Sequence, residues 1–161
     1  MRVFLGLGSN KGRRLANLRR AVAELQSAQG VAVVARSSVY DTAPVDMKPG
    51  TRRFLNAVVE LRTALAPREL LALCKEIEGK LGRRGGHSEP REIDLDILLY
   101  GSLVVDEEDL QIPHPALRWR AFVMEPLLEI WPAAQLPSGE AVTELLTALH
   151  PKQDVRRVGE L

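Results

Sequence analysis

Residues 91–100 read REIDLDILLY, and this alternation of polar and apolar side chains predicts a strand. Successive side chains of a strand point to opposite faces, so Asp94 and Asp96 are expected to share one face. The apolar side chains at positions 93, 95 and 97 then point to the other face, as on a strand that packs against a core. The fold depends on which elements precede and follow this strand.

Three more strands and two helices are predicted before it. The strands are predicted at 2–8, 31–40 and 54–61, and the helices at 13–26 and 67–81. Pro67 suits the first turn of a helix, and Gly30 is expected to end the first helix. The segments 41–52 and 82–90 are rich in Pro or Gly and are predicted loops. The order β-α-β-β-α-β is that of the ferredoxin-like α+β fold, with helices on one side of the sheet.

Length and composition narrow the class of protein further. A chain of 161 residues fits one domain, 1–161, in which short helices at 123–130 and 140–150 are C-terminal additions. A net charge of +1 provides no field for a polyanion. Cys74 is the single cysteine, within an apolar helical stripe, which predicts a reduced core thiol. No signal peptide or membrane segment is recognisable, so we expect a soluble cytoplasmic protein.

The clearest chemical signal is the pair of acids on the fourth strand. The Cα atoms of Asp94 and Asp96 are expected about 6.5–7 Å apart, a spacing at which carboxylates can converge on a hard cation. Magnesium is usually held by one or two carboxylates together with substrate phosphates. Glu92 is expected on the same face, where three like charges repel unless a cation compensates, and Arg83 and Arg91 lie close in the sequence. The plain alternative is a solvent-facing strand with two unremarkable acids.

Three weaker signals accompany the acids. Glycines in GLGSN (6–10) and GRRGGHSEP (82–90) could bring backbone close to phosphates, but neither segment matches a known phosphate loop, and each also fits a flexible connection. His114 stands between two prolines, where it either touches a ligand or braces a turn. Phe54 and Asn56 share a strand face, which suits a flat heterocycle but equally a core Phe beside an Asn.

Taken together, these segments resemble one family, the 6-hydroxymethyl-7,8-dihydropterin pyrophosphokinases of folate biosynthesis. The resemblance runs from residue 3 to 132 in the family's order. It rests on GLGSN (6–10), SSVYDTAPV (37–45), FLNAVVEL (54–61), EIEGKLGR (76–83), PREIDLDILLYG (90–101), IPHPAL (112–117) and RAFVMEPLLEI (120–130). It implies the ferredoxin-like fold. It also implies transfer of the β,γ-pyrophosphoryl unit of ATP to the pterin hydroxymethyl oxygen, with release of AMP.

The resemblance also implies roles for individual residues. The implied ligands of two Mg²⁺ ions are Asp94 and Asp96. The implied catalytic residues are Arg83, Arg91, Asp94 and Asp96. The implied pterin site consists of Thr42, Pro44, Val45, Phe54, Asn56 and Phe122, with the two Phe rings on either side of the pterin. The implied ATP site consists of Leu71, Lys75, Glu78, Arg83, Arg91, Ile97, His114 and Arg120.

The chain departs from the family pattern in the loop 82–90. This loop is shorter than usual and has Ser88 and Glu89 where the family has Trp and Gly, so the aromatic residue that helps to seal the site is missing. Pro115 stands where the family often has Tyr, which removes a contact with the nucleotide. We expect nucleotide to bind first and loops 42–53 and 82–90 then to close over both substrates.

Three other functions are compatible with parts of the pattern. A kinase that transfers only the γ-phosphate would release ADP instead of AMP. A nucleic-acid-binding module of the same fold would present stacking aromatics on a basic sheet, whereas this fourth strand is acidic. A ligand-sensing domain would bind nucleotide without turnover. We expect ATP and the pterin as small-molecule partners, no nucleic-acid or membrane partner, and a monomer.

Overall fold

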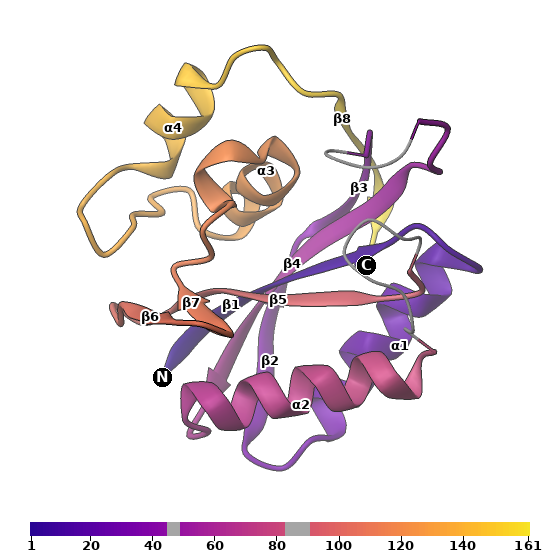
Figure 1. Ribbon diagram of the computed structural model, residues 1–161, viewed down its shortest axis with the longest axis vertical. Coiled ribbons are helices and arrows are strands. Elements are labelled where there is room, and N and C mark those ends of the chain that lie inside the picture. Colours follow the sequence, from indigo (N-terminus) through magenta and orange to yellow (C-terminus); the bar gives the residue numbers. More distant parts are fainter. Residues whose placement is uncertain (45–48, 83–90) are drawn as a thin grey trace.

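The computed structural model describes residues 1–44, 49–82 and 91–161. Its main feature is a twisted sheet with helices on both faces (Figure 1). The strands are β1 (Arg2–Ser9), β2 (Val31–Arg36), β3 (Ser38–Thr42), β4 (Phe54–Thr63), β5 (Asp94–Tyr100), β6 (Val105–Glu107), β7 (Leu110–Ile112) and β8 (Val155–Glu160). The helices are α1 (Arg14–Ser27), α2 (Pro67–Lys80), α3 (Ala121–Ile130) and α4 (Val142–Ala148), with a 3₁₀ turn η1 (Leu117–Trp119).

The order of the strands confirms the predicted fold. In the main sheet the order is β5-β1-β4-β3-β8, and β2 pairs with β4 beyond the end of β3. Every pairing is antiparallel. The predicted strands therefore lie in the order fourth, first, third and second across the sheet, as in the split βαβ arrangement. This order puts β5, with its two acids, at an edge of the sheet beside β1.

The predicted second strand is divided in two at Ser37. The Ser37 amide donates to the Val58 carbonyl at 2.8 Å, and the Val58 amide donates to the Ser37 hydroxyl at 2.9 Å. β2 and β3 therefore follow one another along the same edge of β4. β3 also continues to Thr42, two residues into the segment predicted as a loop, because Asp41 and Thr42 pair with both β4 and β8.

One face of the sheet is covered by α1 and α2, as the sequence predicted. Alternate residues of β1 point into this core, which buries Leu5 and Leu7 with Leu18 of α1 and Ile77 of α2. Cys74 of α2 belongs to the same core and is 1% exposed. Burial raises the pKa of the Cys74 thiol to about 12, which agrees with the predicted unreactive core cysteine.

The C-terminal additions pack over the opposite face. α3 and α4 cover Phe4, Val58 and Leu98 with a second cluster that includes Met124 and Leu127. Figure 1 shows both helices, in orange and yellow, on the side of the sheet away from α1 and α2. Side chains alternate between the two faces along a strand, and Leu98 of β5 faces α3. Asp94 and Asp96, four and two residues before Leu98, therefore face the α3 side as well.

Three further strands were not foreseen from the sequence. β6 and β7 form a separate hairpin after β5, and β8 pairs with the outer edge of β3. Among the described residues, no helix has the length and apolar character needed to cross a membrane.

Candidate active site

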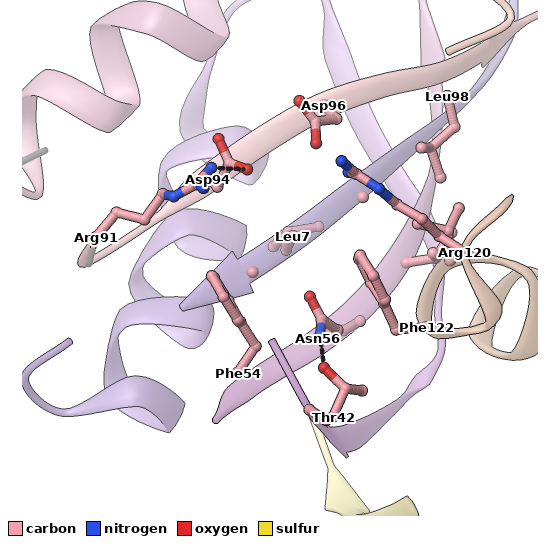
Figure 2. A pocket seen from close by; sticks show the side chains of 16 residues that line it. Leu7, Thr42, Phe54, Asn56, Arg91, Asp94, Asp96, Leu98, Arg120 and Phe122 are labelled. Carbon is pink, nitrogen blue, oxygen red and sulfur yellow. Dashed lines mark hydrogen bonds and ion pairs between the residues drawn. The ribbon is translucent and has the colours of Figure 1, made fainter. Parts of the chain in front are cut away.

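A pocket opens on the α3 side of the sheet, where strands β1, β3, β4 and β5 meet the N-terminus of α3 (Figure 2). We call it the aromatic pocket. The predicted site residues that line it are Thr42, Phe54, Asn56, Arg91, Asp94, Asp96, Arg120 and Phe122. The fold thus brings together residues that are widely separated in the sequence, and it does so by pairing β1 with both β4 and β5.

Two carboxylates from β5 enter this pocket. The side chains of Asp94 and Asp96 are 19% and 36% exposed, while Leu95 between them is buried on the other face. Burial and the negative charge of Asp94 raise the pKa of Asp96 to about 7, although the nearby Arg120 opposes the shift. Two acids on one face of a strand, of which Asp96 resists ionisation, are expected to be stabilised in their charged forms by a cation bound between them.

Glu92 does not share their face, contrary to expectation. β5 begins at Asp94, opposite Gly8 near the end of β1, so the residues before it have left the sheet. The Glu92 carboxylate instead pairs with Lys11 at 3.4 Å. The acidic face therefore consists of two carboxylates.

Arg91 is fixed in the pocket by a residue that the sequence did not single out. The Arg91 backbone amide donates to the Asn10 side-chain oxygen at 2.8 Å, and the Asn10 backbone amide donates to the Arg91 carbonyl at 3.1 Å. The Arg91 guanidinium pairs with Asp94 at 2.8 Å and lies 5.6 Å from the centre of the Phe54 ring. Asn10 ends the GLGSN segment, so part of that motif positions a cation of the site.

The pocket contains a slot between two aromatic rings. Figure 2 shows Phe54 and Phe122 on either side of Asn56, whose side-chain amide donates to the Thr42 hydroxyl at 2.5 Å. The Arg120 guanidinium lies 5.4 Å from the centre of the Phe122 ring. Apolar walls with an amide at the floor can hold a flat heterocycle and read its polar edge.

Gly8 explains a second part of the GLGSN segment. A Cβ atom at Gly8 would lie 2.9 Å from the Asn56 side-chain oxygen and 3.5 Å from the Phe54 ring. The glycine is therefore needed to give Asn56 room, because real Cβ atoms do not approach other atoms so closely. The sequence left two possibilities for this segment, a phosphate loop or a flexible connection. Gly8 instead lies in a strand, where it leaves space for a side chain of the neighbouring strand.

A second pocket adjoins the first at the edge of β5. We call it the hairpin pocket, because the β6–β7 hairpin forms one wall and α2 the other. The predicted nucleotide residues that line it are Leu71, Lys75, Ile97 and His114, and Asp96 lines both pockets. The His114 Nε2 atom lies 3.7 Å from Asp96, and its Nδ1 atom accepts the Ala116 amide at 3.1 Å.

Four other predicted residues are not among the described residues that line either pocket. Glu78 is buried, and its carboxylate accepts the Leu95 amide at 2.8 Å, so it joins α2 to the edge of β5. Pro44 follows Ala43 at the rim and is not among the described lining residues. Val45 and Arg83, together with most of the loop 82–90, lie outside the described residues.

Within the described residues, no group of three or more His, Cys, Asp or Glu side chains is arranged to hold a metal ion. The two acids of β5 would therefore need oxygens from a substrate to complete the coordination of a hard cation. That arrangement is typical of Mg²⁺ sites that bind nucleotide phosphates.

Comparison with known proteins gives the family. Residues 4–132 match the sequence profile described as 7,8-dihydro-6-hydroxymethylpterin-pyrophosphokinase (HPPK). The chain belongs to this family. The match covers almost the span of the resemblance that the sequence motifs indicated, and it confirms the predicted pyrophosphokinase activity in folate biosynthesis. The alternatives of a γ-phosphate kinase, a nucleic-acid module and a ligand sensor are thereby set aside.

Relatives with the HPPK activity in their names are similar over most of the chain. The 2-amino-4-hydroxy-6-hydroxymethyldihydropteridine pyrophosphokinase of Methylorubrum extorquens is 45% identical over 151 residues, covering 93% of this chain and 94% of the relative. The Bacillus subtilis protein of the same name is 42% identical over 142 residues, covering 88% and 84%.

Solved HPPK structures have the same fold. The wild-type HPPK-DHPS of Plasmodium falciparum, solved with pteroate, superposes with a TM-score of 0.70 at 14% identity. The superposition covers 89% of this chain and 41% of that one, so this chain spans about two fifths of the larger protein. At this identity the likeness concerns the fold alone.

Proposed function

We propose that the aromatic pocket binds 6-hydroxymethyl-7,8-dihydropterin and that the hairpin pocket binds ATP, with the reacting groups meeting at Asp96. The observation that carries this proposal is the shared lining: Asp96 is the acid that both pockets contact. One pocket offers aromatic walls and an amide, which suit a bicyclic ring. The other offers apolar residues with Lys75 and His114, which suit a nucleotide. Its hairpin wall also carries Glu108 and Asp109, of which Asp109 is paired with Arg68 at 2.9 Å.

Asp94 and Asp96 fit a magnesium site. They are oxygen ligands on one face of a strand, and burial together with the negative charge of Asp94 raises the pKa of Asp96, a penalty on its ionisation that a bound cation would relieve. We propose that they hold two Mg²⁺ ions together with the phosphates of ATP. When bound, the ions neutralise charge on the phosphate oxygens and help to orient them.

The cationic side chains around the acids are proposed to hold the phosphate chain. Arg91 and Arg120 approach the acids from opposite sides of the pocket (Figure 2), and guanidinium groups can bind phosphate oxygens in a bidentate manner. Arg83 is proposed to assist, and His114 lies beside Asp96 on the nucleotide side. Phosphoryl transfer depends mainly on such positioning and charge neutralisation, so this set is proposed as the catalytic machinery.

The reaction itself is a displacement at the β-phosphorus of ATP. The pterin hydroxymethyl oxygen forms a bond to this phosphorus and loses its proton to solvent, while the bond from the phosphorus to the bridging oxygen of AMP breaks. AMP leaves with the electron pair. The aromatic slot would hold the pterin so that the attacking oxygen lies opposite this leaving oxygen.

The test is product identity with matched variants. The protein is incubated with Mg²⁺, ATP and the pterin, and AMP is measured against ADP. We expect AMP, and loss of at least about a hundredfold in turnover for Asp96→Asn, since charge neutralisation at the phosphates is lost. Asp106→Asn, at an exposed position on β6, is the control and should keep normal turnover. Normal turnover of Asp96→Asn would refute the assignment.

We further propose that the protein acts as a cytoplasmic monomer without a nucleic-acid partner. The buried free thiol of Cys74 agrees with a reducing compartment. The net charge of +1 and the acids on the pocket face argue against binding of a polyanion other than the nucleotide substrate.

A further inference from the structure

Residues 153 and 154 join the two walls of the aromatic pocket, although they lie beyond the family match that ends at residue 132. We call these two residues the C-terminal strap. They follow α4 and precede β8. One wall of the pocket is the N-terminus of α3 with Arg120 and Phe122, and the other is formed by the ends of β3 and β4 with Thr42 and Phe54.

The Gln153 side chain holds the first wall. Its amide oxygen accepts the Ala121 backbone amide at 2.9 Å, and its amide nitrogen donates to the Trp119 carbonyl at 2.8 Å. These two backbone groups flank Arg120 on either side. Gln153 therefore fixes the main chain from which both Arg120 and Phe122 extend into the pocket.

This support replaces a cap that α3 cannot provide for itself. Arg120 occupies the N-cap position, and its side chain makes no cap hydrogen bond. Ser, Thr, Asp or Asn at that position would satisfy an amide of the first turn, whereas Arg120 instead reaches into the pocket. The Ala121 amide is one of the helix amides without an intrahelical partner, and Gln153 satisfies it from 32 residues away.

Asp154 holds the second wall. Its carbonyl accepts the Ala43 amide at 3.1 Å, directly after Thr42. Its carboxylate accepts from Arg53 at 2.8 Å, and Arg53 also pairs with Asp41 at 2.5 Å. Figure 2 shows β8, in yellow, beginning close to Thr42 below the slot. Two consecutive residues thus attach to the α3 wall and to the β3–β4 wall.

We infer that Gln153 is a positioning residue for the pterin: it sets the place of Phe122 across the slot from Phe54. The inference rests on the proposed assignment of the slot to the pterin ring. Without the Gln153 amide, the first turn of α3 would lose its attachment to the strap, and Phe122 would no longer be held at the spacing of a flat ring.

The experiment is a double-mutant cycle on ring affinity. The probe is 6-hydroxymethylpterin, an oxidised fluorescent form that is titrated in the presence of Mg²⁺ and a nonhydrolysable ATP analogue. The variants are Gln153→Ala, Phe122→Ala and the double variant. Gln26→Ala makes the same chemical change at an exposed position of α1 and is the control. Gln153→Met keeps the length of the side chain without its polar atoms, so it tests the inference even if the alanine variant unfolds.

We expect Gln153→Ala and Gln153→Met to weaken binding about fivefold, as for a lost hydrogen bond, and Phe122→Ala about tenfold. In the Phe122→Ala background, the additional Gln153→Ala substitution should weaken binding of the probe less than about twofold, because Gln153 is inferred to act by positioning Phe122. Gln26→Ala should bind normally. A merely structural role would lower the melting temperature without this non-additivity.

Two results would overturn the inference in different ways. If Phe122→Ala weakens binding and Gln153→Met does not, or if their effects simply add, the strap does not act through Phe122, and the slot assignment stands. If Phe122→Ala leaves binding unchanged, the assignment of the slot to the pterin is wrong, and the inference fails with it.

Discussion

At the scale of single residues, two positions on β1 and β5 show how closely the site is packed. Gly8 and Asp94 are partners across the β1–β5 pairing, and Gly8 is also the partner of Asn56 across the β1–β4 pairing. The glycine therefore sits between the amide at the floor of the slot and the first acid. A side chain at this position must displace the Asn56 oxygen, which would lie 2.9 Å from its Cβ atom.

Gly8→Ala is accordingly expected to weaken pterin binding. The added Cβ would lie 2.9 Å from the Asn56 oxygen, so Asn56 must move from Thr42. We expect the KM for the pterin to rise about tenfold with a stability loss of about 1–3 kcal/mol, as for overpacking of a close-packed site. Gly6→Ala, on the same strand and also at the pocket, is the comparison, since the three atoms nearest to its Cβ all belong to the flexible Leu98 side chain, the first at 3.4 Å. Equal effects of both changes on KM would contradict this explanation.

Asp96 makes the stability of the metal-free protein depend on pH. Its pKa in the folded protein, about 7, is above its ordinary value of 3.8. The protonated form is therefore favoured by folding, so the stabilising contribution is present at low pH and is lost as the pH rises toward 7. Asp96→Asn removes this loss and should raise the melting temperature of the metal-free protein more at about pH 8 than at about pH 5.

The size of this effect is limited by solvent. The Asp96 side chain is 36% exposed, so screening reduces the expected gain to about 1 kcal/mol at the higher pH. Thermal unfolding of Asp96→Asn and of the control Asp106→Asn, in the presence of a chelator, measures it. An increase in stability of the same size at both pH values would show that ionisation of the Asp96 carboxyl does not cause it.

At the scale of elements, α3 is attached to the sheet at both ends. Gln153 holds its N-terminus, and Glu129 holds its C-terminal turn. The Glu129 carboxylate accepts the Ser38 amide at 2.9 Å, the Ser38 hydroxyl at 2.7 Å and the Tyr40 hydroxyl at 2.7 Å. Burial opposes ionisation of Glu129, but the hydrogen bonds from Tyr40 and Ser38 outweigh it and lower its pKa.

Glu129→Ala should therefore destabilise the protein by about 2–3 kcal/mol, because several donors on β3 lose a charged acceptor. Because the pKa of Glu129 is lower in the folded protein, its ionised carboxylate stabilises the fold at pH values above the ordinary pKa of a Glu carboxyl. This stabilisation is lost as the pH falls through the pKa of Glu129 in the folded protein. Urea unfolding at neutral and acidic pH should thus show the gap between wild type and variant narrowing in acid. Glu140→Ala removes a partly exposed acceptor of Arg118 and Ser138, and because solvent screens this pair we expect a much smaller change in the unfolding curve. A gap that stays constant would refute the assigned role.

At the scale of the whole molecule, the residues beyond the family match complete the core. Ala134, Leu136 and Val142 are buried with Phe4 and Leu98 in the cluster on the α3 side. β8 also pairs along β3, next to the slot. The region 133–161 therefore packs into the same core as the elements that carry the site.

Truncation after residue 132 tests this point. The shortened chain would lose α4, β8 and the strap, and would expose apolar residues of the α3 side, so we expect loss of cooperative thermal unfolding. Truncation after residue 157 keeps the strap and the buried residues and should melt within a few degrees of the full chain, about 5 °C at most. Cooperative unfolding of the shorter chain, followed by circular dichroism, would show that the C-terminal region is dispensable.

Local periodicity predicted much of this molecule. Alternation along 91–100 placed Asp94 and Asp96 on one face, and the same rule placed Phe54 with Asn56 opposite Leu55. Helical spacing gave α1 and α2 within a residue or so of their bounds. The break at Ser37 escaped this reasoning, because it depends on hydrogen bonds to Val58 and leaves no signature in a run of β-branched residues.

By itself, the sequence determined the order of the elements of the central β-α-β-β-α-β unit and the faces on which Phe54, Asn56, Asp94 and Asp96 lie, because both follow from dihedral preferences and periods within a short segment. Only the tertiary structure decided that Gly8 makes room for Asn56, that Asn10 fixes Arg91 and that Gln153 caps α3. Such contacts join residues 32 to 81 positions apart, as for Gln153 with Ala121 and Asn10 with Arg91. They depend on how packed layers bring distant backbone groups together, and no local pattern encodes that.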